Sequence, residues 1–179
     1  MKTLNVMRIG RLVAPVSLML VLIGCSVDRP MVRMSKGVTL SVYRGFEVEV
    51  TKNGTGSDLP PVILEEVTKR LRSRLAGRGV TVYPDKGDEQ GVAVLRSTLV
   101  SYEVMKPGAL AILPGSKDEC IVHVELIDKH TKQSLGDFVA RGTAGGGGLI
   151  GLATATETRM IDMAAASIAE EIARHMEKR

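Results

Sequence analysis

The chain has 179 residues, with 24 Lys or Arg against 20 Asp or Glu, and its only aromatic residues are two Phe and three Tyr. Three of the basic residues, Lys2, Arg8 and Arg11, come before the first acidic residue, Asp28. Without residues 1–24, 21 basic side chains remain against 20 acidic ones, a net charge of +1. Bulk charge therefore offers no argument for a nucleic-acid partner.

The first 24 residues have the zones of a secretory signal. A basic start is followed by residues 12–23, which are apolar except for Pro15 and Ser17. This run of about a dozen residues is shorter than the ~20 that cross a bilayer as a helix. It fits the apolar region of a signal peptide, so we expect residues 1–24 to be a signal peptide that is removed.

The end of this run, Leu22-Ile23-Gly24-Cys25, resembles the lipobox of bacterial lipoproteins. The resemblance implies that the Cys25 thiol receives a diacylglyceryl group, that the chain is cut before it, and that its new amino end is acylated, for example with palmitate. Each buried methylene contributes roughly 0.8 kcal/mol, so several acyl chains hold a protein at a membrane. Ser26, in place of a retaining Asp, implies the periplasmic side of the outer membrane of a Gram-negative bacterium.

The remaining chain is divided into a polar tether at 25–37 and a single domain at 38–179, a suitable length for one core. Phe46, Val48 and Val50 alternate with acidic residues, which predicts a strand. Apolar residues at spacings of three and four predict two helices. In chain order, the expected elements are a strand at 38–50, a helix at 60–76, strands at 79–83 and 92–105, a hairpin at 119–127 and 134–143, and a helix at 154–177.

This order, β-α-β-β-β-β-α, predicts an α+β fold. We expect a two-layer α/β sandwich, with a mostly antiparallel sheet and two helices on one face. The alternating strands suit a sheet whose other face meets water or a partner.

A family resemblance is carried by the strand LRSTLVSYEV, the hairpin VHVELIDKHTKQSLGDFVARG, the GGGG cluster and the Ala-rich last helix. Together they resemble the uncharacterised bacterial lipoproteins catalogued as domain of unknown function 4410. The resemblance covers most of the chain after the signal, but Thr131 is followed by Lys132 where the family usually has Gly. Because that family has no agreed activity, the resemblance implies a class of protein and no mechanism.

Cys120 is expected to be a buried core residue. With Cys25 lipidated it has no partner for an intrachain disulfide. Strand alternation places it on one face with Val122, whereas His123 and Glu125 share the opposite face, so Cys120 and His123 cannot form a catalytic dyad. The spacing of His123 and Glu125 matches no established ligand pattern. We expect no metal, no cofactor and no enzymatic activity.

Two loops are the candidate contact sites. One is an apolar run between Pro107-Gly108 and Pro114-Gly115, which is costly to leave in water and either folds onto the sheet or meets a partner or the bilayer. The other is a glycine run before the last helix, which lacks the Gly-Lys-Ser/Thr of a phosphate loop and serves as a connector or a partner-binding loop. Their residues are Ala109, Leu110, Ala111, Ile112 and Leu113, and Gly145, Gly146, Gly147 and Gly148.

The basic stretch Lys69 to Arg74 lies within the first expected helix. Such a stretch is either a solvated face or, on a membrane-tethered protein, a face that meets anionic headgroups or peptidoglycan.

The sequence thus favours a non-enzymatic lipoprotein of the outer membrane that binds another envelope protein or assembles with itself. A periplasmic ligand-binding or hydrolytic domain and a subunit of a homo-oligomeric envelope assembly are the alternatives.

Overall fold

The computed structural model describes residues 29–84, 90–104, 117–145 and 153–177. Their helices are α1 (Pro61–Gly77), α2 (Ala153–Glu177) and a short 3-10 turn at Leu40–Val42. The strands are β1 (Met31–Met34), β2 (Gly45–Val48), β3 (Lys52–Asn53), β4 (Val82–Tyr83), β5 (Val92–Glu103), β6 (Lys117–Asp128) and β7 (Ser134–Gly145).

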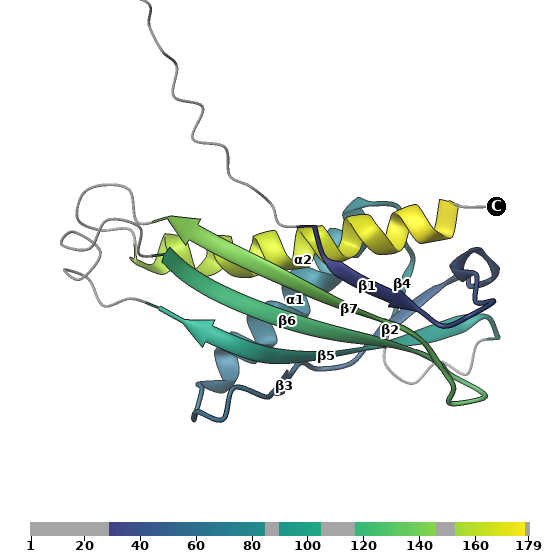
Figure 1. Cartoon of the computed structure of the whole chain (residues 1–179), viewed down its shortest axis with the longest axis horizontal. Helices are drawn as coiled ribbons and strands as arrows, with labels where there is room; N and C mark the ends of the chain where they lie inside the picture. Colours follow the sequence, from purple (N-terminus) through teal and green to yellow (C-terminus); the bar gives the residue numbers. More distant parts are fainter. Residues whose placement is uncertain (1–28, 85–89, 105–116, 146–152, 178–179) are drawn as a thin grey trace, which may run out of the picture.

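In the described ranges these strands form one seven-stranded sheet in the order β1-β7-β6-β5-β2-β4, with β3 also paired to β5. The pairs from β5 to β1 are antiparallel, whereas β2 is parallel to both β5 and β4. Helices α1 and α2 pack together on one face of the sheet (Figure 1). The predicted α+β sandwich, with a mostly antiparallel sheet and two helices on one face, is confirmed.

The largest difference from the sequence-based elements is at the amino end of the domain. Met31–Met34, within the expected tether, form β1 and pair with β7. Val32 and Met34 turn inward and pack against the core, while the backbone covers an edge of β7 that would otherwise expose unpaired polar groups. The folded domain therefore begins before residue 38.

The strand expected at 38–50 is also divided, and β3 lies in the segment expected to be a loop. A 3-10 turn at Leu40–Val42 replaces its first part, and β2 ends at Val48. Three hydroxyl groups hold the chain between β2 and β3. The Thr51 hydroxyl lies 2.9 Å from that of Thr68 on α1 and 2.7 Å from that of Ser97 on β5, and all three residues are buried. The chain turns inward at Thr51 to join this network, because buried polar groups require hydrogen-bond partners.

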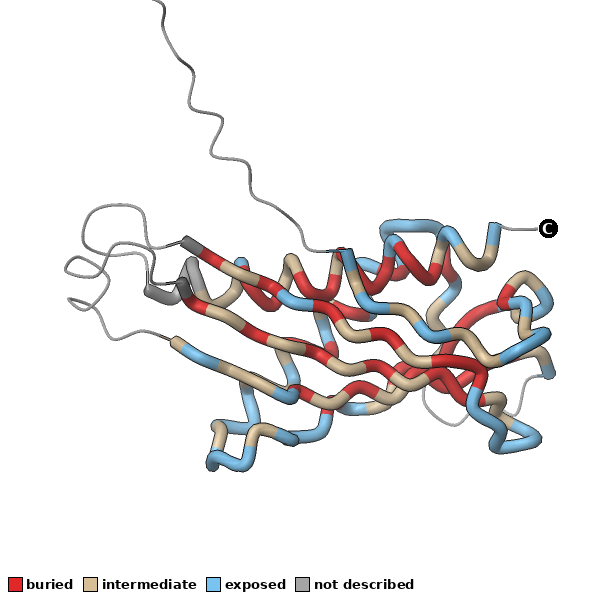
Figure 2. Tube along the Cα trace, viewed as in Figure 1, coloured by how far each residue is buried: buried red, intermediate tan, exposed pale blue. Residues whose placement is uncertain are grey.

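The core lies between the sheet and the two helices (Figure 2). Helix α2 buries an apolar stripe that runs from Ile161 to Ile172, and Met176 is partly buried. Helix α2 approaches β7 closely at Gly142, where a Cβ would lie 1.8 Å from the Met160 carbonyl oxygen. Glycine at this position lets helix and sheet come together.

Candidate functional site

The candidate site is the face of the sheet that no described helix covers, here called the open face (Figure 1). Side chains alternate between the two faces of each strand. On β6, Cys120, Val122 and Val124 point toward the helices and are buried, whereas Ile121 and His123 belong to the open face and are only partly buried. The open face is therefore built from every second residue of β5, β6, β7 and β1.

A largely uncharged strip crosses the middle of the open face. Met31 lies opposite Val139, Val139 opposite His123, and His123 opposite Thr98, so four residues from four strands form one row. Met31 is 60% exposed, although it is a large apolar residue. Ile121 adds a further apolar side chain beside His123 on β6. We call these five residues the strip.

Charged residues border the strip on one side. Arg33, Asp137, Glu125 and Arg96 are successive cross-strand partners. Arg96 donates to Glu49 with an Nε–Oε2 distance of 2.8 Å, and Glu125 lies 3.9 Å away. The hydrogen bond to Glu49 raises the pKa of Arg96, so this side chain stays charged. Such exposed pairs stabilise the fold little and leave their charges available to a partner.

On the other side of the strip, Arg141 on β7 lies 2.6 Å from Glu119 on β6. An apolar centre with a charged rim is the usual anatomy of a protein–protein contact. The open face is therefore suited to another protein surface.

Cys120 is a core residue, as the strand alternation predicts. It is fully buried, and its Sγ donates to the Met160 carbonyl oxygen at 3.3 Å. Burial raises the pKa of the thiol to about 12. The thiol therefore stays protonated at neutral pH, where it is a poor nucleophile and a poor metal ligand.

His123 and Glu125 do share a face, where Glu125 lies 3.9 Å from Arg96. Within the described ranges no group of three or more His, Cys, Asp or Glu is placed to hold a metal ion. The two clefts along α1 include neither residue, nor His130 in the hairpin turn.

The loop residues selected from the sequence are mostly outside the described residues. This holds for Cys25, for Ala109 to Leu113 and for Gly146 to Gly148. Gly145 is the last residue of β7, opposite Lys117 of β6. Sequence reasoning missed Met31 because it lay in the expected tether, although three of the four residues Met31–Met34 are apolar, which was the available signal.

No helix among the described residues, the 25-residue α2 included, is both long and apolar enough to cross a membrane.

No protein-family model matches the chain, and no curated protein does. Among solved structures, the PelC dodecamer from Paraburkholderia phytofirmans is 18% identical, with a TM-score of 0.52 over 76% of this chain and 97% of that chain. Lipoprotein GNA1162 from Neisseria meningitidis is 13% identical, with a TM-score of 0.45 over 73% of this chain and 98% of that chain. A minor lipoprotein from Acinetobacter baumannii is 12% identical, with a TM-score of 0.41 over 74% and 91%.

The similarity to PelC shows a shared fold. The resemblance to the family numbered 4410 stays a prediction.

Proposed function

We propose that this chain is a lipid-anchored, non-enzymatic module of the bacterial envelope, as its resemblance to the 4410 lipoproteins implies, and that it works by binding through the open face. The observation that carries the proposal is the strip of Met31, Val139, His123, Thr98 and Ile121, set between charged residues. Binding surfaces of this kind need no reacting groups, and the thiol of Cys120 is buried.

The anchor would hold this face near the membrane. Cys25 precedes Met31 by six residues, and six fully extended residues reach about 20 Å. Because Met31 is both the start of β1 and one end of the strip, a lipid on Cys25 keeps the strip close to the periplasmic surface of the outer membrane. A partner of the open face is then another envelope component.

A second copy of the chain is the partner that we favour. The solved PelC structure, which shares the fold, is a dodecamer. The charged row also carries both signs, with Arg33 and Arg96 at either side of Asp137 and Glu125. A surface with both signs can complement a copy of itself.

Photo-crosslinking in cells tests the proposal, with a crosslinking residue at position 139 of the full lipidated chain and mass spectrometry of the products. The matched control is position 62, because Val62 is 65% exposed but lies on α1, in the helix layer. We expect self-adducts from position 139 and background levels from position 62. A single adduct with another envelope protein would also support binding through this face, with a different occupant.

The variant Ile121→Asp places a charge within the strip. We expect it to lower the adduct yield at position 139 about tenfold, since truncating central interface residues commonly costs more than 1 kcal/mol. Val62→Asp is the control and leaves the yield unchanged. Equal adducts from positions 139 and 62 would contradict the proposal.

A further inference from the structure

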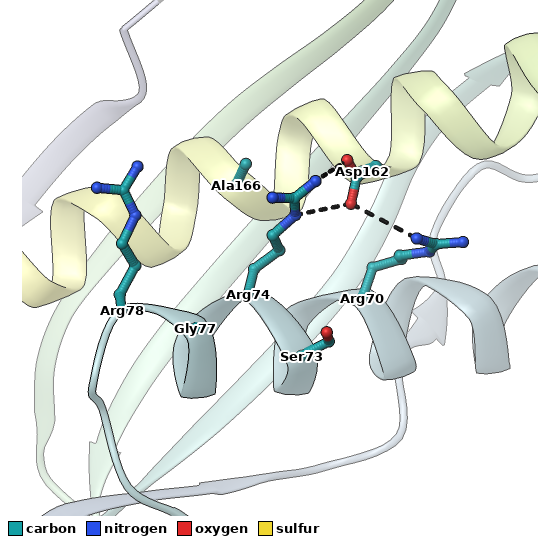
Figure 3. Close-up of a pocket in the computed structure, with 7 residues that line it drawn as sticks. All are labelled: Arg70, Ser73, Arg74, Gly77, Arg78, Asp162 and Ala166. Atoms are coloured by element: carbon teal, nitrogen blue, oxygen red, sulfur yellow. Dashed lines mark hydrogen bonds and ion pairs between the residues drawn. The ribbon is translucent and has the colours of Figure 1, made fainter.

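A cleft of about 340 Å³ lies between α1 and α2 (Figure 3). It belongs to the helix layer, whereas the open face is on the other side of the sheet. Its volume is at the lower end of the ~300–1,000 Å³ typical of small-ligand sites. The charged lining consists of Arg70, Arg74 and Arg78 from α1 and its C-cap, and Asp162 from α2. The cleft is therefore lined by three guanidinium groups and one carboxylate.

The two helices present matched ladders to each other. Arg70, Arg74 and Arg78 recur every four residues, which places them along one face. The facing line of α2 has the same spacing and consists of Asp162, Ala166 and Glu170. The α2 ladder thus has an acidic residue at each end and a methyl group between them.

The acidic residues hold the arginines in place. Arg74 donates from Nε to Asp162 at 2.8 Å and from a terminal nitrogen to the other carboxylate oxygen. Arg78 donates to Glu170 at 2.9 Å, and a terminal nitrogen of Arg70 lies 3.8 Å from Asp162. A guanidinium carries five N–H donors, so these bonds leave donors on Arg74 and Arg78 for a further acceptor.

Figure 3 shows where those donors point. The terminal nitrogen of Arg74 that does not reach Asp162 is directed toward the side of the cleft below Ala166, between Arg74 and Arg78. Asp162 accepts two hydrogen bonds from the other edge of this guanidinium, so its orientation is fixed before a ligand binds. Such preorganisation lowers the entropic cost of binding.

We propose that the cleft binds a phosphate-type oxyanion between Arg74 and Arg78, in the space below Ala166. The planar guanidinium fork matches the oxygens of a phosphate group, and charge-assisted bonds of this kind are about twice as strong as neutral ones. The phosphate belongs either to a soluble phosphorylated compound or to a lipid headgroup. The site is separate from the open face, so it does not depend on the function proposed above.

Isothermal titration calorimetry tests the site, with inorganic phosphate titrated into the full chain in nonionic micelles at constant ionic strength. We expect saturable binding that Arg78→Gln weakens about tenfold, as the loss of one charge-assisted bond implies. Arg44→Gln, the same charge change at an exposed arginine just before β2, leaves the affinity unchanged. Equal weakening by the two variants, or no saturable binding to phosphate or to an anionic lipid, would overturn the proposal.

A second variant separates loss of the site from loss of the fold. Ala166→Glu supplies the carboxylate that the middle of the α2 ladder lacks and fills the space with it. We expect phosphate binding to disappear while the thermal midpoint without phosphate is kept or raised. Binding equal to that of the unchanged chain would overturn the proposal.

The source of the phosphate follows from a competition. If phosphatidylglycerol in the micelles blocks the binding of inorganic phosphate, the ligand is a lipid headgroup. If phosphate binding is unaffected by phosphatidylglycerol, the ligand is a soluble compound. Phosphatidylcholine is the zwitterionic control. Both results support the site. Because the cleft and the open face are separate, we expect Arg78→Gln to leave crosslinking from position 139 unchanged. Failure of the phosphate site is therefore distinguishable from failure of binding through the open face.

Discussion

At the scale of single residues, Asp128 organises the turn between β6 and β7. It accepts hydrogen bonds from the backbone N–H groups of His130 and Thr131 and from the Tyr43 hydroxyl, the last at 2.7 Å. The bonds, foremost that of the Thr131 N–H, lower the pKa of Asp128 to about 2. Burial and the neighbouring Asp128 raise the pKa of Tyr43 to about 12.

This shift predicts acid sensitivity. The unfolded chain has an aspartate pKa of about 3.9, so between about pH 4 and pH 2 it binds more protons than the folded chain. The contribution of Asp128 to the free energy of unfolding is therefore fully present above about pH 4 and is lost as the pH falls toward 2. We expect Asp128→Ala to destabilise the full chain at pH 6 and to have a smaller effect at pH 2, measured by urea unfolding. A difference that is the same at both pH values would contradict this origin, and Asp58→Ala, on an exposed loop, is the control.

Lys132, in the same turn, has a φ of +60°, in the left-handed region. For a residue with a Cβ this backbone conformation costs roughly 1–2 kcal/mol, and glycine avoids most of that cost. Lys132→Gly is therefore expected to raise the free energy of unfolding by up to about 1 kcal/mol, after the larger entropy of the unfolded glycine is subtracted. Chemical unfolding measures the effect. Lys132→Val, which is β-branched, should lower it, and the opposite order of the two variants would refute the assignment.

At the scale of elements, the contact between α2 and β7 depends on Gly142. A Cβ there would meet the Met160 carbonyl oxygen at 1.8 Å and the carbonyl carbon at 2.8 Å, and neither backbone atom can rotate away. Gly142→Ala must push α2 off the sheet, next to the buried Cys120, which bonds to the same carbonyl oxygen.

We expect Gly142→Ala to lower the free energy of unfolding by about 1–3 kcal/mol, the usual cost of overpacking a core. Thermal unfolding followed by circular dichroism measures the change. Gly77→Ala at the end of α1 is the matched control, because nothing lies within 4 Å of its added Cβ. If both variants kept the wild-type midpoint, the close approach of α2 would not be limiting.

At the scale of the whole molecule, the proposed lipid anchor at Cys25 predicts in which cell fraction the domain is found. Cys25→Ser cannot accept a lipid through sulfur, so we expect the chain to leave the membrane fraction for the soluble periplasmic extract and to lose incorporation of labelled palmitate. Cys120→Ala, at the other cysteine, should leave both unchanged, because Cys120 is buried. Continued membrane association and labelling of the Cys25→Ser chain would refute the anchor.

The local patterns of the sequence were sufficient for most of the fold. The apolar periodicity predicted the bounds of α1 and α2 to within about a residue of those observed. Strand alternation correctly predicted that Cys120 is buried and that His123 lies on the opposite face. These features depend on neighbours three or four residues apart in a helix, or two apart in a strand, so they are visible in a single stretch of chain. The pairing of β1 with β7 is different, since it joins residues about a hundred positions apart.

The tertiary structure alone decided both candidate sites. The strip exists because the registers of three strand pairs align Met31, Val139, His123 and Thr98 in one row. The cleft exists because Arg74 meets Asp162, 88 positions away, while Ala166 leaves a space beside them. Local periodicity determines which side of a helix or strand is buried. Which strand or helix packs against it is decided by contacts between residues far apart in the sequence, and a short sequence pattern carries no information about them.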